Sequence, residues 1–249
     1  MKVLHLINNL QREGAQVVVF NLVTSTGPSF VQHIVYAREP GGPLQSALEK
    51  CGIPIYVADQ YYGALATKRS LKFIDQVIEK EAVDVVHAHM TDSAILGWLA
   101  ARRRELPLVT THHGHKILPV CSLICRAVYF VCLFFAARYA QYNIAVSTSV
   151  ANRVRRIPGL DKKSVRIITN GVPVPNEEHV DNRQLNELKS PSIVSVGRLV
   201  ALKGQDQLVA AAAILVNASP TARRADAPCD SNATGVRSPI DIASPWYVS

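Results

Sequence analysis

The sequence predicts an α/β fold in which helices cover a doubly wound parallel sheet, and three observations support this prediction. Short apolar runs alternate with longer helix-like segments from the first residues onward. Several of these runs are nearly continuous Val, Ile and Leu, as is typical of parallel strands buried on both faces. Hydrophobic residues make up 48% of the 249 residues, so a substantial core can form. Alternation of this kind indicates a Rossmann-like sheet.

The predicted strands and helices follow one another in a regular order. Strands are predicted at residues 3–7, 33–37, 53–57, 83–87, 108–111, 143–146 and 165–168. Helices are predicted at residues 15–24, 44–51, 68–81, 92–104 and 149–156. In such sheets ligands bind beyond the carboxyl ends of the strands. We therefore expect the functional residues in the loops that follow the strands.

One apolar segment, residues 117–137, is long enough to span a membrane. Arg126 at its centre would cost about 2.5–3.5 kcal/mol in a bilayer, and a span would separate the strands predicted on either side. We therefore predict a helix that is partly core. An alternative is that its outer side lies on an anionic membrane surface beside neighbouring arginines, giving a cytoplasmic protein a peripheral position on the inner face of the membrane.

The composition limits the class of partner. The net charge is +8, with arginine clusters at residues 102–104 and 153–156. A basic surface attracts nucleic acid, anionic lipid or a phosphorylated substrate. The sequence contains no motif for binding nucleic acid, so nucleic acid is not expected as a partner. Five irregularly spaced cysteines without a secretory leader favour reduced thiols in a cytoplasm.

The composition changes after the first predicted domain, residues 1–172. Residues 173–191 are polar, contain three prolines and indicate an interdomain linker. Residues 192–216 contain a strand, a glycine-containing loop and a helix, which predicts the start of a second α/β domain. Residues 217–249 show no periodicity and predict an irregular or disordered tail. We favour a truncation or a change of reading frame over simple disorder as its origin.

Five of the eight histidines lie at two predicted strand ends. They are His87 and His89, followed by His112, His113 and His115. Residues two apart on a strand face the same side, so His87 and His89 are expected to be co-facial. A metal cluster is one interpretation, although the downstream His and Asp ligands of a hydrolase are missing. The other is acid–base or electrostatic work on a substrate, with Gly114 allowing close backbone approach. Histidines that only satisfy local hydrogen bonds are the structural alternative.

Two loops have the features of anion sites. The segment from Val196 to Gly204 joins a strand-like run to a helix-like run and carries Arg198 and Lys203. Backbone N–H groups at a helix start, together with two cations, suit a diphosphate. A solvated basic loop is an equally good interpretation of this segment alone. In the first loop, Gly14 precedes a helix-like run, but the loop is not a dinucleotide fingerprint.

Taken in order, these pieces resemble the retaining GT-B glycosyltransferases of family 4. The landmarks are Gly14-Ala15, Asp84 to His89, Thr110 to Gly114, Ala145 to Ser147, Ile168 to Val172, and Val196 to Gly204. The resemblance covers residues 1 to about 216. It implies an acceptor-side first domain and a second domain that binds a UDP- or GDP-linked sugar. The implied partners are that nucleotide-sugar and a polysaccharide, lipid-linked or other glycan acceptor, with no separate cofactor and no metal.

The resemblance also assigns roles to residues. His113 is implied to lie beside the transferred sugar as the catalytic residue. Arg198, Lys203 and Gly14 are implied to bind the donor phosphates. The cleft-lining positions are His87, His89, His112, Asn170 and Gly171. Two cations can neutralise the charge that develops on a leaving diphosphate.

The chain departs from the family pattern at three places. Glu13 stands where the family commonly has glycine, and Pro173 stands where it commonly has an acidic residue. The Glu-x7-Glu segment that grips the donor is absent from residues 217–249, which contain no glutamate. We therefore expect impaired or absent transfer by this chain. Two other hypotheses are a non-catalytic acceptor- or membrane-binding module and a metal-dependent hydrolase that uses the histidines. The motif series favours transfer over a sugar-nucleotide epimerase of the same fold.

Overall fold

The computed structural model describes residues 1–27, 29–58, 64–114, 123–172, 195 and 203–218. The chain divides into two compact units, residues 1–175 and 176–249. The first unit holds the sheet, and the second holds helix α8 (Gln205–Ala218). The predicted linker at 173–191 lies outside the described residues, as do most of the predicted strand at 192–196 and most of the tail. The predicted domain boundaries stay predictions.

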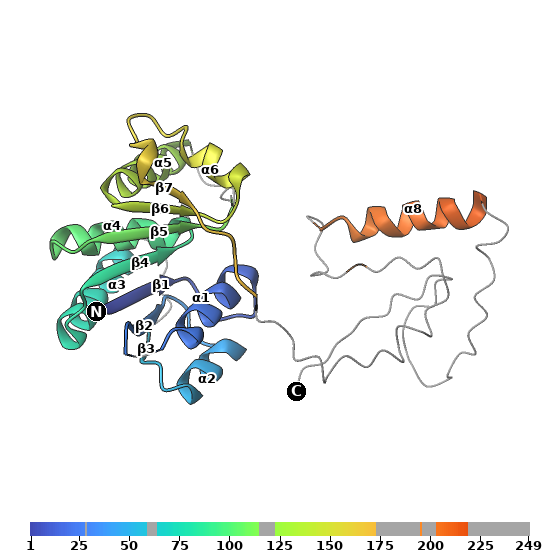
Figure 1. The fold of residues 1–249 in the computed structure, drawn as a ribbon. Coiled ribbons are helices and arrows are strands. Elements are labelled where there is room, and N and C mark those ends of the chain that lie inside the picture. Colours follow the sequence, from blue (N-terminus) through green and yellow to red (C-terminus); the bar gives the residue numbers. More distant parts are fainter. Residues whose placement is uncertain (28, 59–63, 115–122, 173–194, 196–202, 219–249) are drawn as a thin grey trace. The chain divides into compact units, whose positions relative to one another are not determined.

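The first unit is a seven-stranded sheet in which every neighbouring pair of strands is parallel, with the order β3-β2-β1-β4-β5-β6-β7 (Figure 1). The strands are β1 (Lys2–Ile7), β2 (Gln32–Ala37), β3 (Ile55–Val57), β4 (Val85–His89), β5 (Leu108–His112), β6 (Tyr142–Ala145) and β7 (Val165–Ile167). The predicted doubly wound parallel sheet is confirmed.

Helices connect the strands as the sequence predicts. They are α1 (Gly14–Ser25), α2 (Pro43–Lys50), α3 (Ala64–Glu81), α4 (Thr91–Arg103), α5 (Leu123–Tyr139) and α6 (Thr148–Val154), with a 3-10 turn at Lys162–Ser164. Strand β4 runs to His89 instead of ending at residue 87, because Val86 and Ala88 continue the alternation of buried side chains. His89 therefore belongs to the strand itself.

The strand order decides which face of the sheet each helix covers. Parallel strands are joined by right-handed crossovers, so the direction of each step across the sheet fixes the side on which the connecting helix lies. The steps from β1 to β2 and β3 run one way and carry α1 and α2. The steps from β3 to β4 and on to β7 run the other way and carry α3, α4, α5 and α6. The two faces therefore receive different numbers of helices.

We call the face that carries α3 to α6 the closed face. Its strand residues include Leu4, Leu6, Val86, Ala88 and Leu108, all of them at most 1% exposed. They form one hydrophobic cluster with side chains of α3, α4 and α5. This cluster is the main core of the first unit, with burial supplying its principal stabilisation.

We call the other face the open face; it includes Val3, His5, Val85, His87 and Val109. Helices α1 and α2 cover its part over β1 and β2, where Val35 and Ala37 are buried. Among the described elements, no crossover helix belongs to this side of β4, β5 and β6, as the order of the strands requires. The open face is therefore where the fold leaves room for a cavity.

The predicted apolar helix is present as α5, although residues 115–122 lie outside the described part. Ala136 and Ala137 are buried, and Ala136 belongs to the closed-face cluster, which confirms the partly core character of the helix. On its other side Phe130 is 59% exposed, Val131 52% and Phe135 47%. A search of the described residues finds no helix with the length and hydropathy needed to cross a membrane.

Candidate functional site

A cavity of about 640 Å³ lies against the open face of the sheet. Strands β1, β4, β5 and β6 form its floor, α1 forms one wall and the segment after β7 forms another. Its floor contains Val3, His5, Val85, His87, His89, Val109, Thr111 and Ile144. Asn170 and Gly171 line it together with His87 and His89, so the structure brings four of the predicted cleft residues to one cavity.

Four histidines of this region form a hydrogen-bonded chain. His33 Nδ1 lies 2.8 Å from His5 Nε2, and His5 Nδ1 lies 3.1 Å from His89 Nε2. His89 Nδ1 in turn lies 3.4 Å from His113 Nε2. Each of the two central rings uses both of its nitrogens, so the tautomers along the chain depend on one another. The protonation of His113 is thereby linked to His33 on β2.

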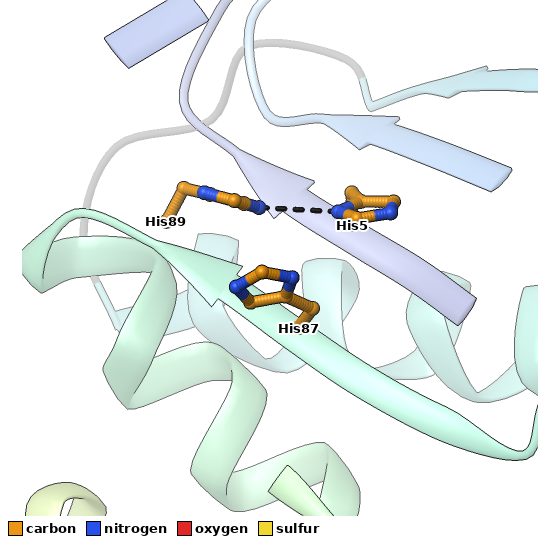
Figure 2. Close-up of side chains that lie close together, drawn as sticks. All are labelled: His5, His87 and His89. Carbon is orange, nitrogen blue, oxygen red and sulfur yellow. Dashed lines mark hydrogen bonds between the residues drawn. The ribbon is translucent and has the colours of Figure 1, made fainter. Parts of the chain in front are cut away.

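His87 lies beside this chain on the open face. Its ring centroid is 4.1 Å from that of His89, which confirms that the two side chains share one side of β4. Its Nε2 lies 2.7 Å from Thr111 Oγ1 on β5. Figure 2 shows His87 and His89 on one strand and His5 on its neighbour. Thr111 thus fixes the orientation of the His87 ring.

Burial keeps these imidazoles neutral. Desolvation is the largest cause of the lowered pKa of His5 and His89, which lies well below 6.5, and the neighbouring histidines lower it further. Desolvation and the charges of His113 and His33 lower the pKa of His87 to about 3. Desolvation followed by the charge of His112 lowers that of His113 to about 4. At neutral pH each ring therefore offers a lone pair and one N–H.

The structure places His112 differently from the other predicted histidines. Its Nε2 lies 3.1 Å from Asn143 Oδ1 and 3.2 Å from Thr110 Oγ1, and Asn143 and Thr110 are themselves buried. In the sheet register Asn143 pairs with Thr110. Thr110 lies two residues after the closed-face residue Leu108 on β5, so it faces the same side as Leu108. His112 therefore belongs to a polar group on the other side of the sheet from His87 and His89.

The first loop positions the start of α1. Asn9 Oδ1 accepts a hydrogen bond from Gln16 Nε2 at 2.7 Å, and Asn8 contacts Asp92 and Ser93 at the start of α4. Gly14 is the first residue of α1, and a Cβ added there would meet nothing within 4 Å. The helix start is therefore open above Gly14, where its free N–H groups can reach an anion.

Of the three predicted donor-phosphate residues, the structure describes Gly14 and Lys203. Arg198 lies outside the described residues, so its predicted role stays a prediction. Lys203 is described and exposed, and it precedes α8 in the second unit. Gly204, with a φ of 67°, adopts a left-handed conformation just before the helix. This glycine conformation is typical of a tight turn into a helix.

Sequence reasoning did not find His5 and His33. Both lie inside runs that predict buried strands, where a single histidine does not by itself indicate a functional site. The signal that could have found them is the strand register, because His5 pairs directly with His87 and Val3 with His33. Two parallel strands far apart in sequence bring these side chains together, and no local spacing records that pairing.

Known proteins match this chain in sequence. A sequence profile of Glycosyltransferase Family 4 matches residues 3–174. A D-inositol 3-phosphate glycosyltransferase of Gordonia bronchialis is 26% identical over 229 residues, and that of Xylanimonas cellulosilytica is 29% identical over 235 residues. These matches cover 86% and 84% of this chain but 48% and 53% of the relatives. The chain thus spans about half the length of the curated relatives it matches.

The fold also matches solved structures. The crystal structure of Anabaena HepE in complex with UDP gives a TM-score of 0.66 at 21% identity, covering 86% of this chain and 58% of HepE. A glycosyltransferase from Rickettsia africae gives a TM-score of 0.62 at 19% identity, covering 87% of this chain and 57% of that protein. At these identities the likeness shows the common fold.

The profile match begins within β1 and ends beyond β7, so it includes the whole sheet. The curated relatives named above are transferases, and the hypothesis of a metal-dependent hydrolase is therefore wrong. Since the matched residues are more than half of the chain, the protein belongs to glycosyltransferase family 4.

Proposed function

We propose that this protein takes part in the transfer of a sugar from a UDP-linked donor to a glycan or lipid-linked acceptor. The observation that carries the proposal is the family match over residues 3–174. UDP is favoured over GDP because HepE has the same fold and has been solved with UDP and with UDP-glucose. The proposed acceptor class is the one that the family resemblance implies, and loops that vary widely on one scaffold select its members.

In this proposal His113 hydrogen-bonds the transferred sugar. Its lowered pKa, about 4, keeps the ring uncharged at neutral pH, so it acts as a hydrogen-bonding group and not as a cation. Its Nε2 contacts His89 Nδ1, and Gly114, with a φ of 135°, follows it. The contact with His89 orients the ring towards one tautomer, and that fixes which nitrogen is left for the sugar.

Arg198 and Lys203, the cations that the family resemblance assigns to the donor phosphates, would neutralise the leaving diphosphate. Within the first unit, the N–H groups at the start of α1 above Gly14 are a further candidate for a phosphate contact. This arrangement needs no metal at the diphosphate, and the proposal includes none. Glu13 at the N-cap of α1 weakens the attraction of this helix end for a phosphate, because its carboxylate brings negative charge there.

Donor binding is tested separately from turnover, because the chain spans half of its relatives. Calorimetry with UDP and UDP-glucose should show binding that Lys203→Ala weakens about tenfold, the effect of one charge-assisted hydrogen bond. Lys162→Ala is the matched control, since Lys162 is an exposed lysine in the 3-10 turn before β7. Equal weakening by both variants, or no binding at all, would contradict the assigned donor site.

Turnover is then measured by release of UDP with a panel of glycan and lipid-linked acceptors. His113→Ala should lower any turnover about a hundredfold while UDP affinity stays within threefold, because His113 is assigned to the sugar and not to the nucleotide. Glu13→Gln should tighten UDP binding about two- to fivefold by removing the opposing charge. Binding without turnover would support a chain that is impaired or inactive as a transferase.

A second candidate function is attachment to an anionic membrane surface through α5. The exposed Phe130, Val131 and Phe135 supply the apolar contact, and Arg138 in the last turn supplies a cation. Sedimentation with phosphatidylglycerol vesicles should show binding that is lost in Phe130→Ser/Val131→Ser. Phe30→Ser is the matched control, because Phe30 is 80% exposed in the loop before β2. Equal binding by all three proteins would exclude α5 as the contact.

A further inference from the structure

The histidines on β1 and β4 converge on one point of the open face. His5 and His87 are direct register partners on adjacent strands, and His89 follows two residues after His87. One ring nitrogen from each of the three lies within 4.8 Å of the other two. Figure 2 shows the three side chains close together, and all three line the cavity. The positions are therefore fixed by the central strands of the sheet.

The outer nitrogens of these three rings already have partners. His5 Nε2 contacts His33, His87 Nε2 contacts Thr111, and His89 Nδ1 contacts His113. Histidines that bind a metal ion almost always engage their second nitrogen in this way, because the outer hydrogen bond fixes the tautomer and the orientation of the ring. The inner nitrogens are His5 Nδ1 and His89 Nε2, which share a hydrogen bond, and His87 Nδ1. An ion at this point replaces the hydrogen bond between His5 and His89.

The spacing of the inner nitrogens suits a small tetrahedral ion. His5 Nδ1 and His89 Nε2 lie 3.1 Å apart. Two nitrogens bound at about 2.05 Å to a tetrahedral Zn²⁺ lie about 3.3 Å apart, so this pair needs almost no movement. The limit of 4.8 Å for the whole group means that the most distant pair of nitrogens must approach by up to about 1.5 Å to bind one tetrahedral ion.

The chemistry of the ligand set selects the ion. Imidazole suits Zn²⁺ and the neighbouring first-row transition metals, whereas Mg²⁺ and Ca²⁺ prefer oxygen ligands. A neutral imidazole binds such an ion through the lone pair of one ring nitrogen. Three protein nitrogens leave a fourth tetrahedral position, and the cavity provides the space for a water or an anion there.

We propose that His5, His87 and His89 form a binding site for one Zn²⁺ ion, whose fourth ligand comes from the cavity. His33, Thr111 and His113 are the outer hydrogen-bond partners that orient the three ligands. None of the three ligands is assigned to the donor diphosphate, so metal binding is measured without donor or acceptor. His113 is shared by the two proposals, because it contacts His89 and is also the residue assigned to the sugar.

Metal binding is measured on the full chain after EDTA treatment and transfer to metal-free buffer. Equilibrium dialysis against Zn²⁺, with the metal determined by mass spectrometry, should give one tightly bound ion per chain. Co²⁺ in its place should give the intense visible bands of a tetrahedral site without thiolate charge-transfer bands. His87→Ala should weaken this binding at least tenfold. His112→Ala is the matched control and should bind the ion as the unaltered chain does, since His112 lies on the other face.

A second pair of variants tests the outer partners without touching a ligand. Thr111→Val removes the hydroxyl beside His87 Nε2 and should lower the affinity about 10- to 100-fold, whereas Thr111→Ser should retain it. Circular dichroism in EDTA verifies that each variant folds. Three results would overturn the proposal: no stoichiometric Zn²⁺, thiolate bands with Co²⁺, or equal affinity in the unaltered, Thr111→Val and His87→Ala proteins. In that event the histidines form a hydrogen-bonded group without an ion.

Discussion

The two faces of the sheet are made by alternate residues of the same strands, yet they serve different purposes. Leu108 on the closed face is fully buried in the main core, whereas its neighbour Val109 lines the cavity. Similarly, Leu4 and Leu6 pack against helices while His5 between them belongs to the histidine group. The crossover direction determines this division, because it assigns four helices to one face and two to the other. In these strands, alternate residues either pack in the core or line the cavity.

Of the changes that test the two faces, a lower pH should reduce the free energy of unfolding most. Burial lowers the pKa of His5, His87 and His89, so the unfolded chain takes up protons near pH 6.5 while the folded chain does not. The free energy of unfolding of metal-free protein is then highest above about pH 7 and falls as the pH drops below 6.5. Each histidine contributes up to about 1.4 kcal/mol per pH unit, or about 4 kcal/mol per unit for these three. His33 and His113, whose pKa is also lowered, add to this dependence.

Urea unfolding in EDTA at pH 7.5, 6.5 and 5.5 measures this dependence. His87→Gln should reduce the slope between pH 6.5 and 5.5 by about one fifth, because one of the five histidines with a lowered pKa is removed. A free energy of unfolding that is constant over this range would show that the open-face histidines are hydrated in solution.

A pair of neighbouring substitutions compares the two faces directly. Leu108→Ala should lower the free energy of unfolding by about 2–5 kcal/mol, because it leaves a void in the closed-face core. Val109→Ala should cost less than about 1 kcal/mol, because its side chain already borders a cavity. Chemical denaturation of both proteins gives the comparison. Equal losses would mean that the open face is as tightly packed as the closed one.

Added volume should also affect the closed face. A Cβ at Gly97 of α4 would lie 3.0 Å from Ala88 Cβ and 3.2 Å from Leu108 Cδ1. Gly97→Val should therefore destabilise the protein by about 1–3 kcal/mol through overpacking. Thermal unfolding monitored by circular dichroism measures the change. Val18→Ile on the cavity wall formed by α1 is the control, and it should leave the stability within about 0.5 kcal/mol.

Exposed ion pairs between α3 and α4 should contribute least to the free energy of unfolding. Arg103 contacts the Asp75 carboxylate at 3.0 Å, but its side chain is 59% exposed. Arg103→Gln should cost about 0.2–1 kcal/mol, because water and salt screen the pair. Repeating the unfolding in 0.5 M salt should abolish the difference. A loss that persists in salt would assign the arginine a packing role.

The fold could be predicted from the sequence because its signals are local. Runs such as residues 3–7 and 108–111 have the period of buried strands, and the helices between them are long enough to recognise. The co-facial pair His87 and His89 was predictable for the same reason. The extension of β4 to His89 was missed, since the histidines interrupt the apolar run without interrupting the strand.

The rest of the site could not be predicted, because it depends on pairing between distant segments. Nothing near His5 or His33 in the sequence indicates that both will contact the group that includes His89. The opposite placement of His112 depends on Asn143 of β6, which the register pairs with Thr110. Strand order and register are properties of the whole sheet, and a single sequence does not specify them locally.

The contact between His5 and His89 joins residues 84 positions apart in the sequence. It can form only after β4 has docked beside β1, and such non-local pairing is slow because the intervening chain must first be closed into a loop. The histidine group therefore forms only once β1 and β4 have paired. A chain in which β4 has not yet been synthesised contains His5 but not the group. Under the proposal of a metal site, the appearance of Co²⁺ absorption would therefore mark the pairing of β4 with β1.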